Sequence, residues 1–180
     1  MEMTGEQIIP AAQAEVWRGL NDPEVLKACI TGCESIEKLT GTEYAIVTTA
    51  AIGPVKAKFR GKLLLADLDP PNSYSLSFDG QGGAAGFGKG SAKVSLAAAG
   101  AGTRLSYAVK AQVGGKLAQI GSRLIDGVAK KLADDFFAAF NRKMAGPAPA
   151  AVPAETAPGA APLWWVVAII AAMFLLAYYT

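Results

Sequence analysis

The stretch KLAQIGSRLIDGVAKKLADDFFAAFNRK, residues 116–143, decides the fold. Its apolar residues recur at every third or fourth position, which is the period of an amphipathic α-helix. At a rise of about 1.5 Å per residue, one helix over this stretch is about 40 Å long, enough to lie across a whole antiparallel sheet. The predicted inner stripe consists of Leu117, Ile120, Leu124, Val128, Leu132, Phe136 and Phe140.

The residues before this helix alternate between apolar and polar side chains, with the two-residue period of β-strands. Two short helices are predicted, one over 11–20 and one that begins at Pro23, with Asp22 as its N-cap, and ends near Cys29 or Gly32. Strands are predicted over 5–9, 35–39, 44–52, 55–65, 73–79, 89–97 and 104–113. This order predicts an α+β fold in which an antiparallel sheet curls around the long final helix.

Two segments of distinct composition follow the helix. Residues 145–162 are rich in Pro and Ala, which favours extended polyproline II structure, with a reach on the order of 50 Å. Residues 163–179 form an uninterrupted apolar run, at the lower limit for crossing a bilayer, and the run has no charged face for an interfacial helix. Aromatic belts at both interfaces are predicted for Trp164, Trp165, Tyr178 and Tyr179. We therefore predict a domain over 1–144, a linker over 145–162 and a transmembrane anchor over 163–180.

The composition limits the classes of function. The chain has no His, which excludes Ser–His and Cys–His nucleophiles and makes an enzyme less expected. Its two cysteines, Cys29 and Cys33, are too few for a zinc site or an iron–sulfur cluster. The net charge of +2 gives no reason to expect nucleic-acid binding. Residues 1–10 lack the features of a secretory signal, so we expect the domain in the cytoplasm with reduced thiols.

Two motifs allow both a structural and a functional interpretation. Residues 83–89 have the spacing of a phosphate-binding loop, but Gly90 stands where that loop needs Ser or Thr. We interpret them as a strand connection or a mobile lip of a cavity, with Phe87 as an apolar plug. The second motif is a basic stripe that is either a solvated face or a docking surface for an acidic partner or anionic headgroups. It consists of Lys56, Lys58, Arg60 and Lys62.

Several local strings resemble the G-subunit family of carbon monoxide dehydrogenase, which is part of the START-like (SRPBCC) helix-grip superfamily. The strings are 20–26, 29–34, 53–56, 59–61, 67–71 and 114–125, and the resemblance covers about residues 1–143. It implies an antiparallel sheet that grips a long C-terminal helix around an apolar cavity. It also implies an accessory role beside a molybdenum hydroxylase of the carbon monoxide dehydrogenase type at the cytoplasmic membrane.

Together, these observations predict a single-pass, tail-anchored protein without enzymatic activity, whose domain faces the cytoplasm and recruits that hydroxylase. We expect no metal and no covalent cofactor. As a hypothesis, the cavity holds a lipophilic molecule, a respiratory quinone or another lipid, because an enzyme releasing electrons in the cytosol needs an acceptor and quinones are confined to the bilayer. The residues expected to line the cavity are Trp17, Phe59, Leu63, Leu76, Phe78, Phe87, Tyr107, Ile120, Leu124 and Val128.

Two alternatives to this interpretation stay open at the level of the sequence. One is a small hydrolase, cyclase or isomerase on the same fold, with Glu34, Asp67 and Asp79 as the carboxylates available for catalysis. The other is a purely structural membrane anchor whose core is filled. An apolar cavity of several hundred Å³ would favour ligand binding over the filled core.

Overall fold

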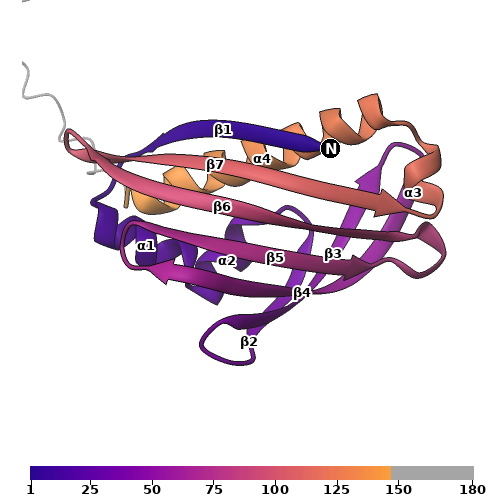
Figure 1. Cartoon of the computed structure of the whole chain (residues 1–180), viewed down its shortest axis with the longest axis horizontal. Helices are drawn as coiled ribbons and strands as arrows, with labels where there is room; N and C mark the ends of the chain where they lie inside the picture. Colours follow the sequence, from indigo (N-terminus) through magenta and orange to yellow (C-terminus); the bar gives the residue numbers. More distant parts are fainter. Residues whose placement is uncertain (147–180) are drawn as a thin grey trace, which may run out of the picture. The chain divides into compact units, whose positions relative to one another are not determined.

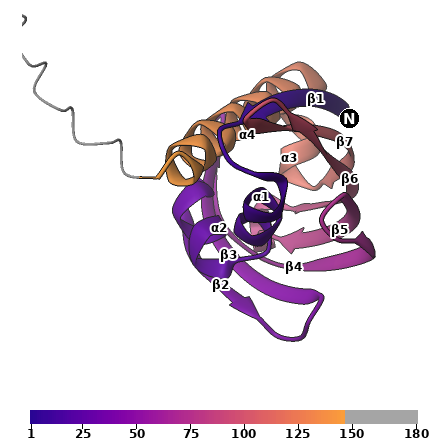
Figure 2. The ribbon, with the colours of Figure 1, turned by 90° about the vertical axis from the view of Figure 1, so that its left-hand side faces the viewer.

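Within residues 1–146, which the computed structural model describes, seven strands form one antiparallel sheet in the order β1-β7-β6-β5-β4-β3-β2. Figures 1 and 2 show the sheet curling around the helices on its concave side. Every predicted strand is present, and most extend beyond their predicted bounds. The strands are β1 (Glu2–Ile9), β2 (Cys33–Lys38), β3 (Glu43–Ile52), β4 (Val55–Asp69), β5 (Ser73–Gln81), β6 (Phe87–Ala99) and β7 (Gly102–Gly114).

Strand β4 shows how the sheet obtains an inner and an outer face. The apolar residues of its first half are half-buried and the four basic residues between them are exposed, which confirms the predicted alternation. The register continues this division across the sheet, since Phe59 lies opposite Thr48 of β3 and Leu63 lies opposite Phe78 of β5. The inner face therefore offers apolar side chains to whatever packs in the concavity.

Two short helices, α1 (Gln13–Leu20) and α2 (Pro23–Cys29), lie together at one end of the sheet (Figure 2). The predicted cap of α2 is confirmed, because the backbone N–H of Glu24 donates a hydrogen bond of 2.9 Å to Oδ1 of Asp22. Pro23 occupies the first helical position, where its missing N–H has no helical partner to lose. We call this end of the sheet the closed end.

The C-terminal helix is interrupted, which corrects the prediction of one helix over 116–143. A four-residue helix, α3 (Lys116–Gln119), is separated from the long helix α4 (Ser122–Met144). The interruption falls at Gly121, whose φ of +100° lies in the region that favours glycine and cannot continue an α-helix. The predicted stripe is correspondingly displaced in α4. Leu124 and Leu132 are 42% and 39% exposed, whereas Ile125, Phe137 and Phe140 are buried.

The core is concentrated at the closed end. Phe140 of α4 is 0% exposed, and it packs in one cluster with Ile9, Val16 and Leu105. The rings of Phe136 and Phe140 stack with their centroids 5.7 Å apart, and Phe137 stacks on Tyr107 at 5.3 Å. The second half of α4 is therefore held by dense aromatic packing. Its first half covers the opposite end of the sheet, which we call the open end.

No helix within residues 1–146 combines the length and the hydrophobicity needed to cross a membrane. Helix α4 ends at Met144. The predicted anchor over 163–180, including Trp164, Trp165, Tyr178 and Tyr179, lies outside the described residues, as does nearly all of the predicted linker.

Candidate functional site

The concave face of the sheet borders three adjoining compartments, two of which are also lined by helix α4. The inner compartment, of about 300 Å³, lies toward the closed end. The middle compartment, of about 730 Å³, lies under the first half of α4, and the end compartment, of about 300 Å³, extends toward α3. Ligand sites of small molecules usually occupy about 300–1,000 Å³, so the space is large enough for a ligand.

The wall of the inner compartment is almost entirely apolar. Strands, α2 and α4 all contribute to it, which ties its shape to the fold as a whole. Its lining comprises Met3, Leu20, Leu26, Ile30, Tyr44, Leu63, Leu65, Tyr74, Leu76, Ala92, Val94, Leu105, Tyr107, Val109, Ala133, Phe136 and Phe137. Such a wall favours the transfer of an apolar molecule from water by about 25 cal/mol per Å² of buried apolar surface.

Shared lining residues show that the three compartments adjoin one another. Met3, Ile30, Val109, Ala133 and Phe136 border both the inner and the middle compartments. Thr48, Ala50 and Phe78 border both the middle and the end compartments. We call the whole space the chamber. Its compartments lie side by side along the concave face of the sheet.

The polar groups of the inner compartment are tyrosine hydroxyls. The hydroxyl of Tyr44 donates a hydrogen bond of 3.0 Å to the backbone carbonyl of Asn21. Tyr74 is buried, and its ring packs edge to face against Trp17 with the ring centroids 5.5 Å apart. Burial is the main cause that raises the pKa of Tyr74, and the nearby Tyr44 raises it further. No hydrogen bond joins the Tyr74 hydroxyl to another of the described residues, so it remains available as a neutral donor to a ligand.

The three carboxylates considered for catalysis are all exposed. Glu34 forms an ion pair of 2.7 Å with Lys58 and accepts a hydrogen bond from the Thr49 hydroxyl, and these two interactions lower its pKa. Asp79 accepts a hydrogen bond from Gln81, and Asp67 lies near the end of β4. Neither Glu34 nor Asp67 lines the chamber, and Asp79 borders only its end compartment. Among residues 1–146, no group of three His, Cys, Asp or Glu side chains is placed to hold a metal ion.

Six of the ten residues expected to line the cavity border the chamber. Leu63, Leu76 and Tyr107 line the inner compartment, Phe78 and Val128 line the middle one, and Phe59 lines the end one.

The other four residues lie beside the chamber. Trp17 packs against the core behind Tyr74. Phe87 packs against Gly114, on the strand that follows a 3₁₀ turn at Gly83–Ala85. Ile120 and Leu124 lie against the β3–β4 turn at Gly53.

Sequence reasoning did not assign several lining residues to the chamber. Met3 belongs to the part of β1 that precedes its predicted start at residue 5. Ala133 and Phe137 lie one helical position away from the predicted stripe. Tyr44, at the start of β3, lies on the same face of the strand as Ile46 and Thr48. The alternation of that strand could therefore have identified Tyr44 as a residue of the inner face.

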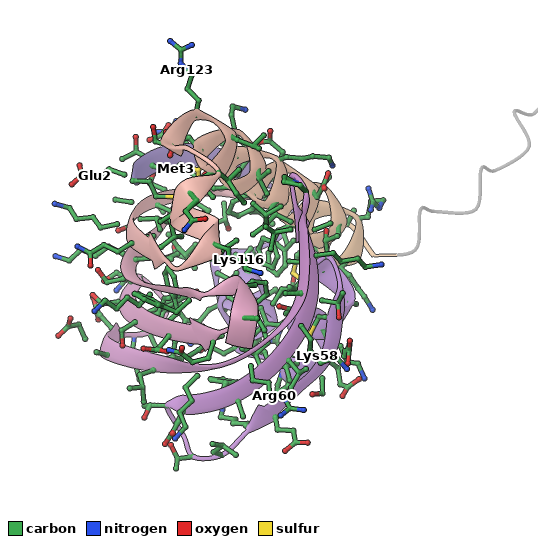
Figure 3. The ribbon with its side chains drawn as sticks, turned by 90° about the vertical axis from the view of Figure 1, so that its right-hand side faces the viewer. Glu2, Met3, Lys58, Arg60, Lys116 and Arg123 are labelled. Atoms are coloured by element: carbon green, nitrogen blue, oxygen red, sulfur yellow. The ribbon has the colours of Figure 1, made fainter. Side chains whose placement is uncertain are left out.

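The basic stripe follows the exposed side of β4, with Lys56 at its end also bordering the middle compartment, and half of the stripe is engaged in ion pairs. Lys58 pairs with Glu34 at 2.7 Å and Lys62 pairs with Glu43 at 2.9 Å. Lys56 and Arg60 form no ion pair with another residue of the described region. Figure 3 shows Lys58 and Arg60 on the outer side of the sheet. The stripe is therefore less positive than its sequence indicates.

The two cysteines are free thiols that take part in packing. Cys29 is buried at the end of α2, and Cys33 is half-buried at the start of β2. Burial raises the pKa of both thiols, more than nearby cations lower it. Both thiols are therefore poor nucleophiles at neutral pH.

Solved structures of the same fold come from several organisms. A conserved protein from Geobacillus kaustophilus is 35% identical and superimposes with a TM-score of 0.76, over 81% of this chain and 95% of that one. A Thermus thermophilus protein and Ara h 8.0201 are each 18% identical, with TM-scores of 0.60 and 0.59, and both cover 80% of this chain and 97% of their own. These two support the helix-grip fold alone.

The family comparison covers nearly the whole of the described region. No curated protein matches the chain. Residues 5–145 match the family model of the carbon monoxide dehydrogenase G subunit (CoxG). This match confirms the resemblance carried by the local strings, and the chain belongs to the CoxG family of carbon monoxide dehydrogenase, a family of accessory rather than catalytic subunits.

Proposed function

We propose that this protein is a membrane-tethered, non-enzymatic accessory subunit that binds a lipophilic molecule, a respiratory quinone, in its chamber. It would serve a molybdenum hydroxylase of the carbon monoxide dehydrogenase type. The observation that carries the proposal is the largely apolar chamber of adjoining compartments in a member of the CoxG family. Extraction of quinone from the purified chain tests it.

The chemistry of the chamber supports a quinone over a purely hydrocarbon ligand. The apolar walls would bury an isoprenoid tail, and the hydroxyl of Tyr74 would donate a hydrogen bond to a quinone carbonyl. Because Tyr74 lines the inner compartment, the headgroup would lie toward the closed end and the tail toward the open end in this proposal. A filled core is a weaker explanation, since it predicts no space between the sheet and α4, where the middle compartment alone measures about 730 Å³.

The tether is proposed from the sequence of residues 163–180. Deleting them should move the protein from the membrane fraction to the soluble fraction, while the chain still unfolds in one cooperative transition. The reason is that the core cluster lies entirely within residues 9–144. Fractionation and circular dichroism provide the measurements. A deletion protein that stays with the membrane, or that aggregates, would show that the apolar run is not a separable anchor.

The outer basic stripe is proposed as the docking surface for the hydroxylase. Arg60 is the informative position because it is exposed and forms no ion pair with another described residue. Arg60→Glu should weaken binding of the purified hydroxylase several-fold at low salt, and less at high salt, where surface charges are screened. Binding is measured by surface plasmon resonance.

The matched control for Arg60→Glu is Lys93→Glu, which makes the same reversal of sign on the exposed face of β6. Lys58 and Lys62 are less informative, because a Glu at either position would face the carboxylate with which the lysine now pairs. Equal binding by the native chain and by Arg60→Glu at both salt concentrations would show that the stripe is a solvated face and not a docking surface.

A further inference from the structure

Large apolar side chains are exposed at the open end, beside the middle compartment. We call the open side of this compartment along α4 the mouth of the chamber. Leu124, Val128 and Leu132 follow one another at four-residue intervals on α4, and Leu124 and Leu132 are 42% and 39% exposed. Val128 and Leu132 also line the middle compartment, together with Ala51 at the end of β3. The apolar interior therefore continues onto the surface along this side of α4.

The turn between β3 and β4 completes this apolar edge. Gly53 has a φ of +58° at the tip of the turn, and a side chain there would meet Cδ2 of Leu124 at 2.7 Å. The tip thus rests directly against the first turn of α4. We define the lip as the turn at residues 52–55 together with Leu124, Val128 and Leu132.

Three cations lie at the open end, close to the lip along the chain. Lys56 follows the turn and borders the middle compartment, Arg123 precedes Leu124, and Lys116 begins α3 at the same end of the sheet. None of the three forms an ion pair within residues 1–146, whereas Lys58, Lys130 and Lys131 each have a carboxylate partner. In Figure 3, which views the open end, Arg123 projects away from the body of the domain.

We propose that the lip docks onto an anionic membrane surface, so that the mouth of the chamber faces the lipid. Exposed leucines would enter the boundary between headgroups and acyl chains, and the three cations would meet anionic headgroups. The docking itself follows from the lip, but its role as an entry route for quinone rests on the proposed function.

The geometry of the chain permits this orientation although α4 ends at the closed end. Helix α4 has 23 residues, and its length is about 35 Å at a rise of about 1.5 Å per residue. The Pro- and Ala-rich stretch that follows reaches on the order of 50 Å when extended. These lengths are compatible with the proposed orientation.

The test places a fluorescent probe on the lip of the full chain in vesicles. Leu132→Cys carries the probe in a Cys33→Ser background, where the buried Cys29 is protected from labelling. Leu64→Cys is the matched control, because Leu64 is 46% exposed on the opposite, outer face of β4. A lipid-borne quencher in phosphatidylglycerol-containing vesicles should quench the probe at position 132 several-fold more strongly than the probe at position 64.

The charge contribution is tested in the same assay with Lys56→Glu combined with Arg123→Glu. This double variant should lose most of the quenching at position 132. The protein with its native Lys56 and Arg123 should lose it likewise when the vesicles consist of pure phosphatidylcholine. Equal quenching at positions 132 and 64 would overturn the proposal, as would protection of position 132 only when the hydroxylase is added. If the purified protein carried no quinone, the proposed ligand would be wrong, but the stronger quenching at position 132 would still show that the lip docks onto the membrane.

Discussion

Replacing Phe140 with alanine should lower the free energy of unfolding by about 3–5 kcal/mol. Phe140 is 0% exposed, its ring stacks on that of Phe136, and Gly19 of α1 approaches it closely. Truncation to Ala would leave a cavity where α4 meets the closed end, and the surrounding aromatic rings are too constrained to fill it. Urea denaturation of the chain ending at residue 146, followed by circular dichroism, measures the effect.

The matched control is Leu132→Ala on the same helix. Leu132 is 39% exposed, so its truncation should change stability by no more than about 0.5 kcal/mol. The periodic pattern of the sequence placed both residues on one buried stripe, whereas the structure separates them. Comparable losses for the two variants would mean that α4 packs with Leu132 inward and that the chamber is lined differently.

Replacing Val128 with tryptophan should abolish ligand retention with little loss of stability. Val128 lines the middle compartment of about 730 Å³, which has room for an indole ring. In a filled core the same substitution would cost about 1–3 kcal/mol through overpacking. Bound lipid and the free energy of unfolding are measured on the same preparations.

The control for Val128→Trp is Ala138→Trp, which adds the same ring at an exposed position of α4. It should retain the ligand and unfold like the native chain. If Val128→Trp were destabilised by several kcal/mol while the native chain carried no lipid, the chamber would be a packed core and the ligand-binding account would fail.

Much of this fold could be predicted from the sequence because its strands are half-buried. The alternation in 55–65 requires one face to meet apolar side chains, and it correctly separates Phe59 and Leu63 from the lysines between them. The cap at Asp22 depends only on neighbouring residues and was equally accessible. Local rules work where the energetic cause is local.

The departures from prediction arise where the cause is non-local. The interruption at Gly121 depends on a backbone conformation that apolar periodicity does not record. The pairs Lys58–Glu34 and Lys62–Glu43 depend on how β2, β3 and β4 align, so the stripe seemed more positive than it is. A cavity and a filled core produce the same alternation, because both need an apolar inner face. Only the three-dimensional arrangement separates them.

Mass spectrometry of the apolar molecules extracted from the purified full chain tests whether the chamber holds a quinone. The chain is isolated from its membrane in mild detergent beside Val128→Trp and Ala138→Trp. We expect quinone close to one equivalent per chain for the native protein and for Ala138→Trp, and almost none for Val128→Trp. Equal trace amounts in all three preparations would contradict this expectation, because the quinone would then be carried by the detergent and not by the chamber.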